Sequence, residues 1–162
     1  YREDPIFLDP RNKQLGARLI INLEKLYLSL KKLDLHNANL EEYYSLSHGL
    51  GIVPKDLNKL QDKLFGIECN FEELNGIDFK KGCYIGQEVT ARMKHKAKLK
   101  NKLYCGHIPI DPKNKDDKKI YFDGKVVGEI YSIFNNYCLI KIKEDFKEEK
   151  LTVFGQPLTL VN

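Results

Sequence analysis

The apolar and polar positions in the first third of the chain predict one strand followed by two helices. The run from Gly16 to Asn22 follows the turn-forming DPRNKQ and contains β-branched residues, which is typical of a strand. Leucines then recur at helical spacing from Leu23 to Leu33, so we expect an amphipathic helix there. A second, short helix should begin after the capping residue Asn39 and end at the glycines Gly49 and Gly51, ahead of Pro54.

The last third of the chain has the pattern of a small all-β unit. Short runs rich in Ile, Val, Tyr and Phe occupy residues 103–110, 118–122, 125–134, 137–143 and 151–154. We expect two-residue reversals at Asp123-Gly124, Asn135-Asn136 and Gly155-Gln156. Five or six strands of this length predict an antiparallel barrel or sandwich, because a closed sheet has no free edges. The polar loop 111–119 is expected to be mobile.

The helical pattern of the first part and the strand pattern of the last part place the chain in the α+β class, with a domain boundary near residues 95–100. The predicted domains are residues 1–95 and residues 96–162, and a chain of 162 residues is long enough to bury a core. With 42% hydrophobic and 31% charged residues, the composition is that of a soluble globular protein. No apolar run approaches the ~20 residues that cross a bilayer, and the first residues show no export signal. Because the sequence has no initiator Met, we expect a processed chain or the later part of a longer one.

Charge adds a local feature to this outline. The net charge is +4, but the eight cations from Lys80 to Lys102 face the single acid Glu88, which makes +7 (8 − 1) there and −3 (4 − 7) elsewhere. Such a patch is either the solvated face of a lysine-rich chain or a surface for an anion such as nucleic acid. No Phe, Tyr or Trp lies among the lysines at alternate positions from Lys94 to Lys102, and the next one is Tyr104, which weakens the case for single-strand recognition.

The cysteines are widely spaced and do not resemble a zinc site. Cys69, Cys83, Cys105 and Cys138 form no CxxC pair and no cluster with paired histidines, so no metal site is expected. Without an export signal, reduced thiols are favoured over disulfides.

Cys83 has the surroundings of a thiol that could be activated. Ile85, Val89 and Met93 recur every four residues, which predicts a helix from Ile85. Cys83 would then lie just ahead of the helix N-terminus, where the dipole and the ammonium groups of Lys80 and Lys81 favour a thiolate. The spacing alone leaves open that the thiol is an inert buried one.

The stretch Lys81-Gly82-Cys83-Tyr84-Ile85-Gly86-Gln87-Glu88, with Arg92 after it, resembles the signature K-G-C-[YF]-x-G-Q-E-x-x-[AS]-R of the YgfZ family of folate-binding proteins. This family is related to the glycine-cleavage T-protein and includes mitochondrial iron–sulfur assembly factors. The resemblance continues in Phe7 to Arg11 with Leu15 to Arg18, in Tyr43 to Pro54, in Gly66 to Phe79 and in Val127 to Ser132.

The resemblance implies the C-terminal part of a T-protein-like folate-binding domain over residues 1–95, followed by a small β-barrel over residues 96–162. Relatives are longer at the N-terminus, so we expect a member that lacks that part. The implied function is folate-dependent support of iron–sulfur cluster assembly or repair in client enzymes, including those that modify tRNA. The implied cofactor is tetrahydrofolate, the implied partners are cluster-assembly proteins or clients, and no membrane is involved. The location is then the bacterial cytoplasm or the mitochondrial matrix.

The resemblance also assigns residues to the site. It makes Cys83 and Lys81 the catalytic residues. It makes these residues the ones that bind the folate: Glu68, Asn70, Gly82, Gly86, Gln87 and Arg92. Glu68 and Asn70 suit the N–H and amino donors of a pterin edge, but in the alternative interpretation they satisfy backbone groups of a turn. Glu88 is expected to cap the helix or to pair with Arg92.

Three other functions stay open from the sequence. An aminomethyltransferase of the glycine-cleavage type would use the same folate chemistry, but that transferase lacks a cysteine signature at this turn. An RNA-binding module would use the lysines at alternate positions from Lys94 to Lys102. A thiol enzyme would need a base for Cys83, and His95, twelve residues on, is about three helical turns away.

Overall fold

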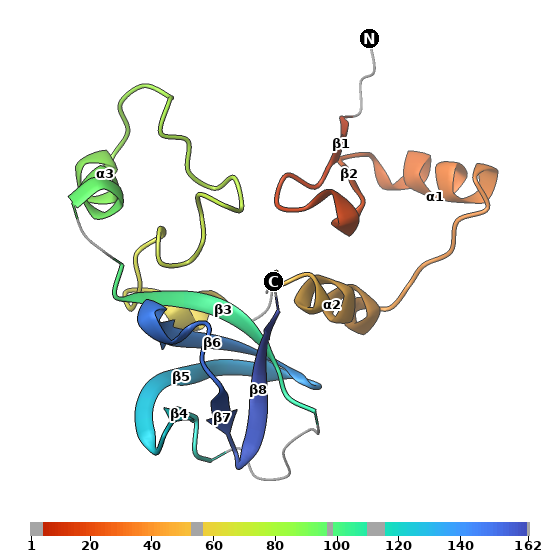
Figure 1. The fold of residues 1–162 in the computed structure, drawn as a ribbon. Helices are drawn as coiled ribbons and strands as arrows, with labels where there is room; N and C mark the ends of the chain where they lie inside the picture. The colour runs from red at the N-terminus through yellow and green to blue at the C-terminus, as the bar shows by residue number, and fades with distance from the viewer. Residues whose placement is uncertain (1–4, 53–56, 97–98, 110–115, 162) are drawn as a thin grey trace.

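A computed structural model describes residues 5–52, 57–96, 99–109 and 116–161 (Figure 1). The chain is α+β, as the sequence predicts. A small hairpin and three α-helices come from the first 96 residues, and the later residues form a barrel. The boundary predicted at residues 95–100 and the division into two domains stay predictions.

The N-terminal hairpin pairs β1 (Ile6–Leu8) with β2 (Ala17–Leu19) in antiparallel register. The one-turn 3₁₀-helix η1 (Lys13–Leu15) lies between them. The strand expected over residues 16–22 is therefore present but shorter, and β1 was not predicted. Asp9 ties the connection together: its buried carboxylate (3% exposed) accepts hydrogen bonds from the Arg11 guanidinium and backbone and from Arg18 Nε.

Both predicted helices form, and the second begins at the predicted cap Asn39. The helix α1 (Leu23–Lys32) begins at Asn22, whose side chain accepts the Glu24 N–H at 2.8 Å. The helix α2 (Leu40–Gly49) begins at Asn39, whose side chain accepts the Glu42 N–H at 2.9 Å. A side-chain oxygen at this position satisfies a backbone donor that has no partner within the helix.

The barrel consists, within the described residues, of six antiparallel strands in the order β3-β6-β5-β4-β7-β8. The strands are β3 (Asn101–His107), β4 (Lys119–Phe122), β5 (Lys125–Phe134), β6 (Tyr137–Lys143), β7 (Leu151–Val153) and β8 (Gln156–Val161). A 3₁₀ turn, η3 (Glu144–Phe146), joins β6 to β7. The contact of β8 with β3 closes the sheet and removes its edges. Most of the predicted mobile loop 111–119 lies outside the described residues.

The turns of the barrel follow the sequence signals with one shift. Asp123 and Gly124 both have positive φ, as a type I′ hairpin requires. The reversal at Asn135-Asn136 is also present, between the paired residues Phe134 and Tyr137. The reversal predicted at Gly155-Gln156 lies one residue earlier, because Val153 pairs with Gln156 and the turn residues are Phe154 and Gly155. Phe154 itself has a φ of 51°.

The barrel interior is the main core of the protein. Its buried members are Ile108, Ile120, Val127, Ile130, Cys138, Ile140, Ile142, Leu151, Val153 and Leu158. Strand β5 passes so close to β6 that a Cβ on Gly128 would lie 2.3 Å from the carbonyl oxygen of Lys141. Only glycine fits this crossing without movement.

The outer face of β3 joins the barrel to the preceding segments. Leu103, Cys105 and Leu139 form a second apolar cluster with Leu60 of the 3₁₀-helix η2 (Leu57–Leu60). The helix α2 adds His48, whose ring stacks on Phe134 with a centroid separation of 5.2 Å.

Candidate functional site

The signature loop runs into the helix α3 (Gln87–Lys96), which begins two residues later than predicted. Gly86 interrupts the expected helix with a φ of 86°. Its carbonyl then accepts both the N–H and the hydroxyl of Thr90, at 3.2 and 3.0 Å. Cys83 thus lies four residues before the first helical residue, not directly at the helix terminus. The four-residue repeat beginning at Ile85 predicted the helix, but Ile85 is fully exposed and has no core to cover.

The Cys83 thiol is open to solvent. The Lys81 ammonium lies over the ring of Tyr84, 4.5 Å from its centroid, so its described contact is with that ring. The hydroxyl of Tyr84 is buried and has no hydrogen-bond partner in the described part of the chain. At Gly82 and Gly86, no described atom lies within 4 Å of the position that a Cβ would occupy, so a large partner can approach this loop.

The other three thiols are less accessible. Cys69 is half-buried, and burial together with the Glu68 charge raises the pKa of its thiol. Burial raises the pKa of the Cys105 and Cys138 thiols to about 12. Because the thiolate is the nucleophile and the metal ligand, Cys83 is the cysteine best placed to meet another molecule.

Arg92 and Gln87 lie on α3 beyond the loop. Arg92 Nη2 donates to Glu88 Oε1 at 2.8 Å, which confirms the predicted pair one turn apart. Both side chains are exposed, so the pair contributes little to stability. Gln87 is the first residue of the helix, and its N–H donates to the Tyr84 carbonyl at 3.2 Å.

Two lysines of the basic stretch are used inside the protein. Lys94 pairs with Glu72 and also lies over the ring of Phe79, 4.0 Å from its centroid. Lys102 pairs with Glu73 at 2.5 Å. Partial burial acts to raise the pKa of Glu73, but the hydrogen bond from Lys102, a backbone hydrogen bond and the charges of Lys102 and Lys94 together leave this pKa below its usual value. The local excess of positive charge is therefore smaller than the sequence alone indicates. Lys98 and the Lys96 side chain lie outside the described part.

Glu68 and Asn70 are engaged with backbone groups. Glu68 Oε2 accepts the Phe65 N–H at 2.9 Å, and its carbonyl accepts the Leu103 N–H at 2.9 Å. Asn70 Nδ2 donates to the Leu103 carbonyl at 2.7 Å. These contacts support the alternative interpretation, in which the two side chains hold a turn.

Two cavities are lined mainly by residues that precede the signature in the sequence. One of about 490 Å³ is lined by Glu72, Asn75, Ile77, Asp78, Phe79, Lys80 and Lys94. The other, of about 230 Å³, is mostly apolar and is lined by Leu60, Gln61, Asp62, Leu64, Gly66, Cys69, Phe71 and Leu74. Both sets consist of residues other than those that the resemblance placed at the folate.

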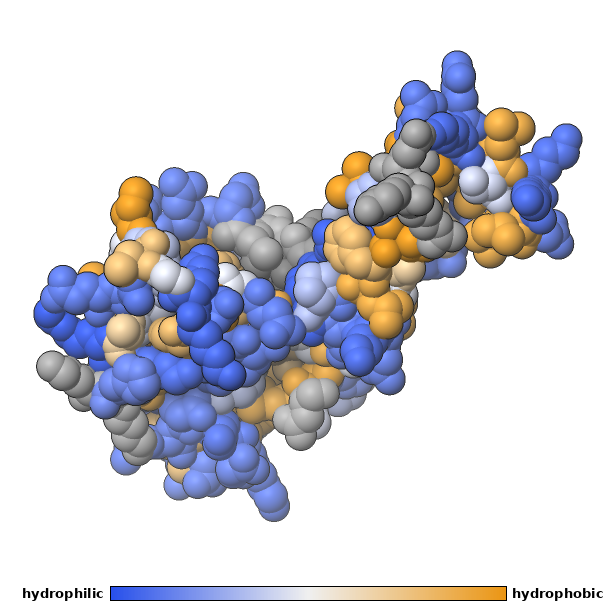
Figure 2. Space-filling model, turned by 90° about the horizontal axis from the view of Figure 1, so that it is seen from above, coloured by the Kyte–Doolittle hydropathy of each residue, from blue (hydrophilic) through white to orange (hydrophobic). Residues whose placement is uncertain are grey.

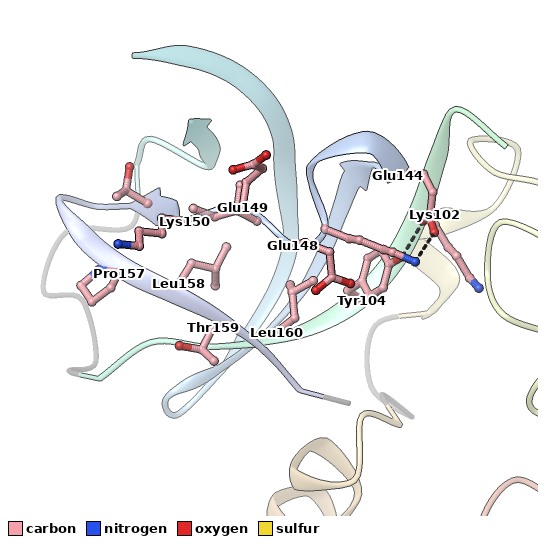
Figure 3. Close-up of a pocket in the computed structure, with 13 residues that line it drawn as sticks. Lys102, Tyr104, Glu144, Glu148, Glu149, Lys150, Pro157, Leu158, Thr159 and Leu160 are labelled. Carbon is pink, nitrogen blue, oxygen red and sulfur yellow. Dashed lines mark hydrogen bonds and ion pairs between the residues drawn. The ribbon is translucent and has the colours of Figure 1, made fainter. Parts of the chain in front are cut away.

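A larger cavity, of about 800 Å³, lies on the barrel, where β3, η3 and β8 meet (Figure 3). Tyr104 donates a 2.5 Å hydrogen bond to Glu144, and Lys147 pairs with the same carboxylate at 3.2 Å. Burial and this hydrogen bond raise the pKa of Tyr104. The cavity is lined by residues between Lys102 and Leu160, so it belongs to the barrel and not to the signature loop.

One buried atom fits the implied folate. Asn70 Oδ1 is buried and has no hydrogen-bond partner in the described part, so it could accept a pterin N–H. The remaining candidates lie on an open loop or are bonded to the protein itself. The described residues thus provide an acceptor for such a ligand but do not enclose it.

Sequence reasoning missed the cluster around Asp9. The hydrogen bonds from Arg11 lower the pKa of Asp9 against the opposing effect of burial, and Arg18 lowers it further. Arg11 Nη2 also donates to Tyr43 of α2 at 2.8 Å. The DPR and LGAR segments stand out in the sequence only as part of a resemblance, and nothing local indicates that their charges meet.

The described residues contain neither a membrane-spanning helix nor a cluster of metal-binding side chains. No helix in the described ranges is long and apolar enough to span a membrane. Among the same residues, no three His, Cys, Asp or Glu side chains gather as metal ligands would.

Comparisons with known proteins identify relatives of the chain, although no family model matches it. A mitochondrial homologue of the iron–sulfur cluster assembly factor IBA57 in Dictyostelium discoideum is 30% identical over 100 residues, which are 61% of this chain and 24% of that protein. The homologue in Yarrowia lipolytica is 23% identical over 145 residues, 88% of this chain and 29% of that protein. The tRNA-modifying protein YgfZ of Colwellia psychrerythraea is 35% identical over 79 residues, 44% of this chain and 24% of that protein.

These relatives support a YgfZ-type family for the chain, over part of their length. It spans about a quarter of the length of the curated relatives that it matches. The YgfZ-type assignment agrees with the resemblance seen in the signature and adds relatives named for iron–sulfur assembly and for tRNA modification.

Proposed function

We propose that this chain acts in the assembly or repair of iron–sulfur clusters in client enzymes, including enzymes that modify tRNA. The names of its relatives support this role. The observation that carries the proposal is the exposed thiol of Cys83, which stands in the complete YgfZ-type signature on an open loop.

The proposed site is the loop from Lys80 to Gly86 together with the start of α3. Cys83 is the group that meets the cluster or the one-carbon chemistry, because a thiolate is both a nucleophile and an iron ligand. Lys81 is the positive neighbour on the same loop. Its position on the Tyr84 ring supports a role in shaping the loop, since a cation over an aromatic face contributes about 0.5–1 kcal/mol at an exposed site.

The test is rescue of a cell that lacks its own factor of this family. The wild-type chain and the variants Cys83→Ser and Cys69→Ser are expressed at matched levels, and the activity of a cluster-dependent enzyme is measured. We expect Cys83→Ser to rescue poorly and Cys69→Ser to rescue as the wild type does. Equal rescue by both variants would remove Cys83 from the mechanism, and no rescue by the wild-type chain would count against the cluster role itself.

Tetrahydrofolate binding is a finer part of the proposal. The family resemblance and the unpaired Oδ1 of Asn70 support it, because a pterin carries N–H and amino donors. Tetrahydrofolate is titrated calorimetrically into the 162-residue chain and into Asn70→Ala. We expect binding that weakens in the variant. Absence of heat with the wild-type chain would contradict folate binding by these residues while leaving the cluster role to the rescue experiment.

A further inference from the structure

The helix α3, which follows the signature loop, has little apolar support. None of its described residues belongs to either apolar cluster, and Val89 exposes 49% of its surface. Figure 1 shows α3 standing apart from the barrel, and Figure 2, seen from above, shows a mainly hydrophilic surface at that end of the molecule. An isolated helix needs roughly 12–15 residues to be stable in water, and α3 has 10. Contacts with other segments must therefore keep it folded.

Lys94 is the described side chain of α3 that reaches another segment. Its ammonium pairs with the carboxylate of Glu72 and lies 4.0 Å from the centroid of the Phe79 ring. The other side-chain hydrogen bonds described for α3 join residues one helical turn apart. The Lys94 side chain is also partly covered, with 32% of its surface exposed. It thus differs from a lysine on a solvated face.

The segment that receives Lys94 is fixed to the rest of the fold. Glu73 pairs with Lys102 of β3 at 2.5 Å. Asn75 Nδ2 donates to the Pro10 carbonyl at 2.7 Å. Lys94 therefore joins α3 to a segment that is itself attached to the barrel and to the N-terminal hairpin.

We propose that Lys94 is a positioning residue for the signature loop. Held by Glu72 and Phe79, it keeps α3 folded and so fixes the end of the loop that carries Cys83. The effect on α3 stands on these contacts alone, whereas the effect on activity rests on the role proposed for Cys83. An arginine should replace Lys94, because a guanidinium also pairs with a carboxylate and lies on an aromatic face, and a glutamine should not.

The first test is amide hydrogen exchange of the 162-residue chain, read by mass spectrometry of peptides. In Lys94→Gln, the amides of α3 should exchange roughly tenfold faster, because the loss of both contacts favours local unfolding. The barrel amides should stay as in the wild type, which shows that the variant folds, and Lys94→Arg should protect α3 as the wild type does.

Lys100→Gln is the matched control for this exchange experiment. Lys100 is exposed and has no ion pair among the described residues, so the variant removes the same charge from the same stretch without touching α3. Unchanged exchange of α3 in Lys94→Gln would overturn the proposal. So would an equal change in Lys100→Gln, since net charge and not the contact would then be responsible.

The second test separates the two contacts of Lys94. Glu72→Gln removes the ion pair, and Phe79→Leu removes the aromatic face. Each should speed the exchange of α3 in the wild-type background and have much less effect in the Lys94→Gln background, because coupled residues are not additive. Full additivity would mean that Glu72 and Phe79 act independently of Lys94 and would contradict the proposal.

The rescue experiment measures the consequence for activity. We expect Lys94→Gln to rescue less well than the wild type, although its Cys83 is still alkylated, and Lys94→Arg and Lys100→Gln to rescue fully. Full rescue by Lys94→Gln with a loosened α3 would overturn the positioning role. If the wild-type chain does not rescue, the cluster role fails, while hydrogen exchange still decides whether Lys94 holds α3.

Discussion

Asn70 and Leu103 are joined across the junction between the signature segment and the barrel. The Asn70 amide donates to the Leu103 carbonyl at 2.7 Å, while the Leu103 N–H donates to the Glu68 carbonyl at 2.9 Å. The segment before the signature thus takes the place of a neighbouring strand at the start of β3. Asn70 does this with a φ of 60°, a conformation that Asn and Asp tolerate better than most residues.

Asn70→Asp tests this junction. A carboxylate keeps the shape and the tolerance of positive φ but cannot donate to the Leu103 carbonyl. We expect the free energy of unfolding, measured in urea, to fall by about 1–3 kcal/mol. Asn135→Asp is the control, because Asn135 has a similar φ in an exposed hairpin turn and should change stability by less than about 0.5 kcal/mol. Equal effects at the two sites would mean that the hydrogen bond contributes nothing.

Asp9 should make part of the stability depend on pH. The hydrogen bonds from Arg11 and Arg18 hold the pKa of Asp9 well below its usual range in the folded chain. A lowered folded pKa adds stability above the unfolded value of about 3.9, and this gain is lost as pH falls toward the folded pKa. The difference in unfolding free energy between wild type and Asp9→Asn should therefore be largest near neutral pH and shrink below about pH 4. A difference that is constant down to acid pH would contradict the ion cluster.

Gly128→Ala tests the close crossing of β5 and β6. The added methyl group would meet the Lys141 carbonyl oxygen at 2.3 Å and Ile142 Cγ2 at 2.6 Å. We expect a loss of about 1–3 kcal/mol in thermal or urea unfolding, as for an overpacked core. Gly82→Ala is the matched control, because nothing lies within 4 Å of its Cβ position. A neutral Gly128→Ala would show that the two strands separate easily.

The four thiols should react at different rates in the folded chain. Cys83 is exposed, whereas burial raises the pKa of Cys105 and Cys138 to about 12 and keeps reagents away. We expect an alkylating agent to label Cys83 first and the two barrel cysteines only in denaturant, as read by mass spectrometry of peptides. Early labelling of Cys105 or Cys138 would mean that the barrel opens readily.

Local features of this chain could be predicted from its sequence. Asn39 caps a helix and Asp123-Gly124 turns a hairpin because these effects act between residues only a few positions apart. The ion pair of Glu88 with Arg92 is likewise set by helical spacing. The short apolar runs after residue 100 predicted a small antiparallel barrel or sandwich for the same reason, since strand patterns and turn residues are recognised within short windows.

The tertiary structure decided how distant segments use the same residue types. The sequence left Glu68 and Asn70 open between a ligand and a backbone contact, and packing against Leu103 engages them with the backbone. In the sequence, Lys94 and Lys102 belong to a basic patch with one acidic residue. In the fold, Glu72 and Glu73 lie beside them and form ion pairs with them. The strand order and the exposure of Cys83 and α1 were decided in the same way. Each depends on contacts between residues far apart in the chain, which no local pattern of hydrophobicity or charge encodes.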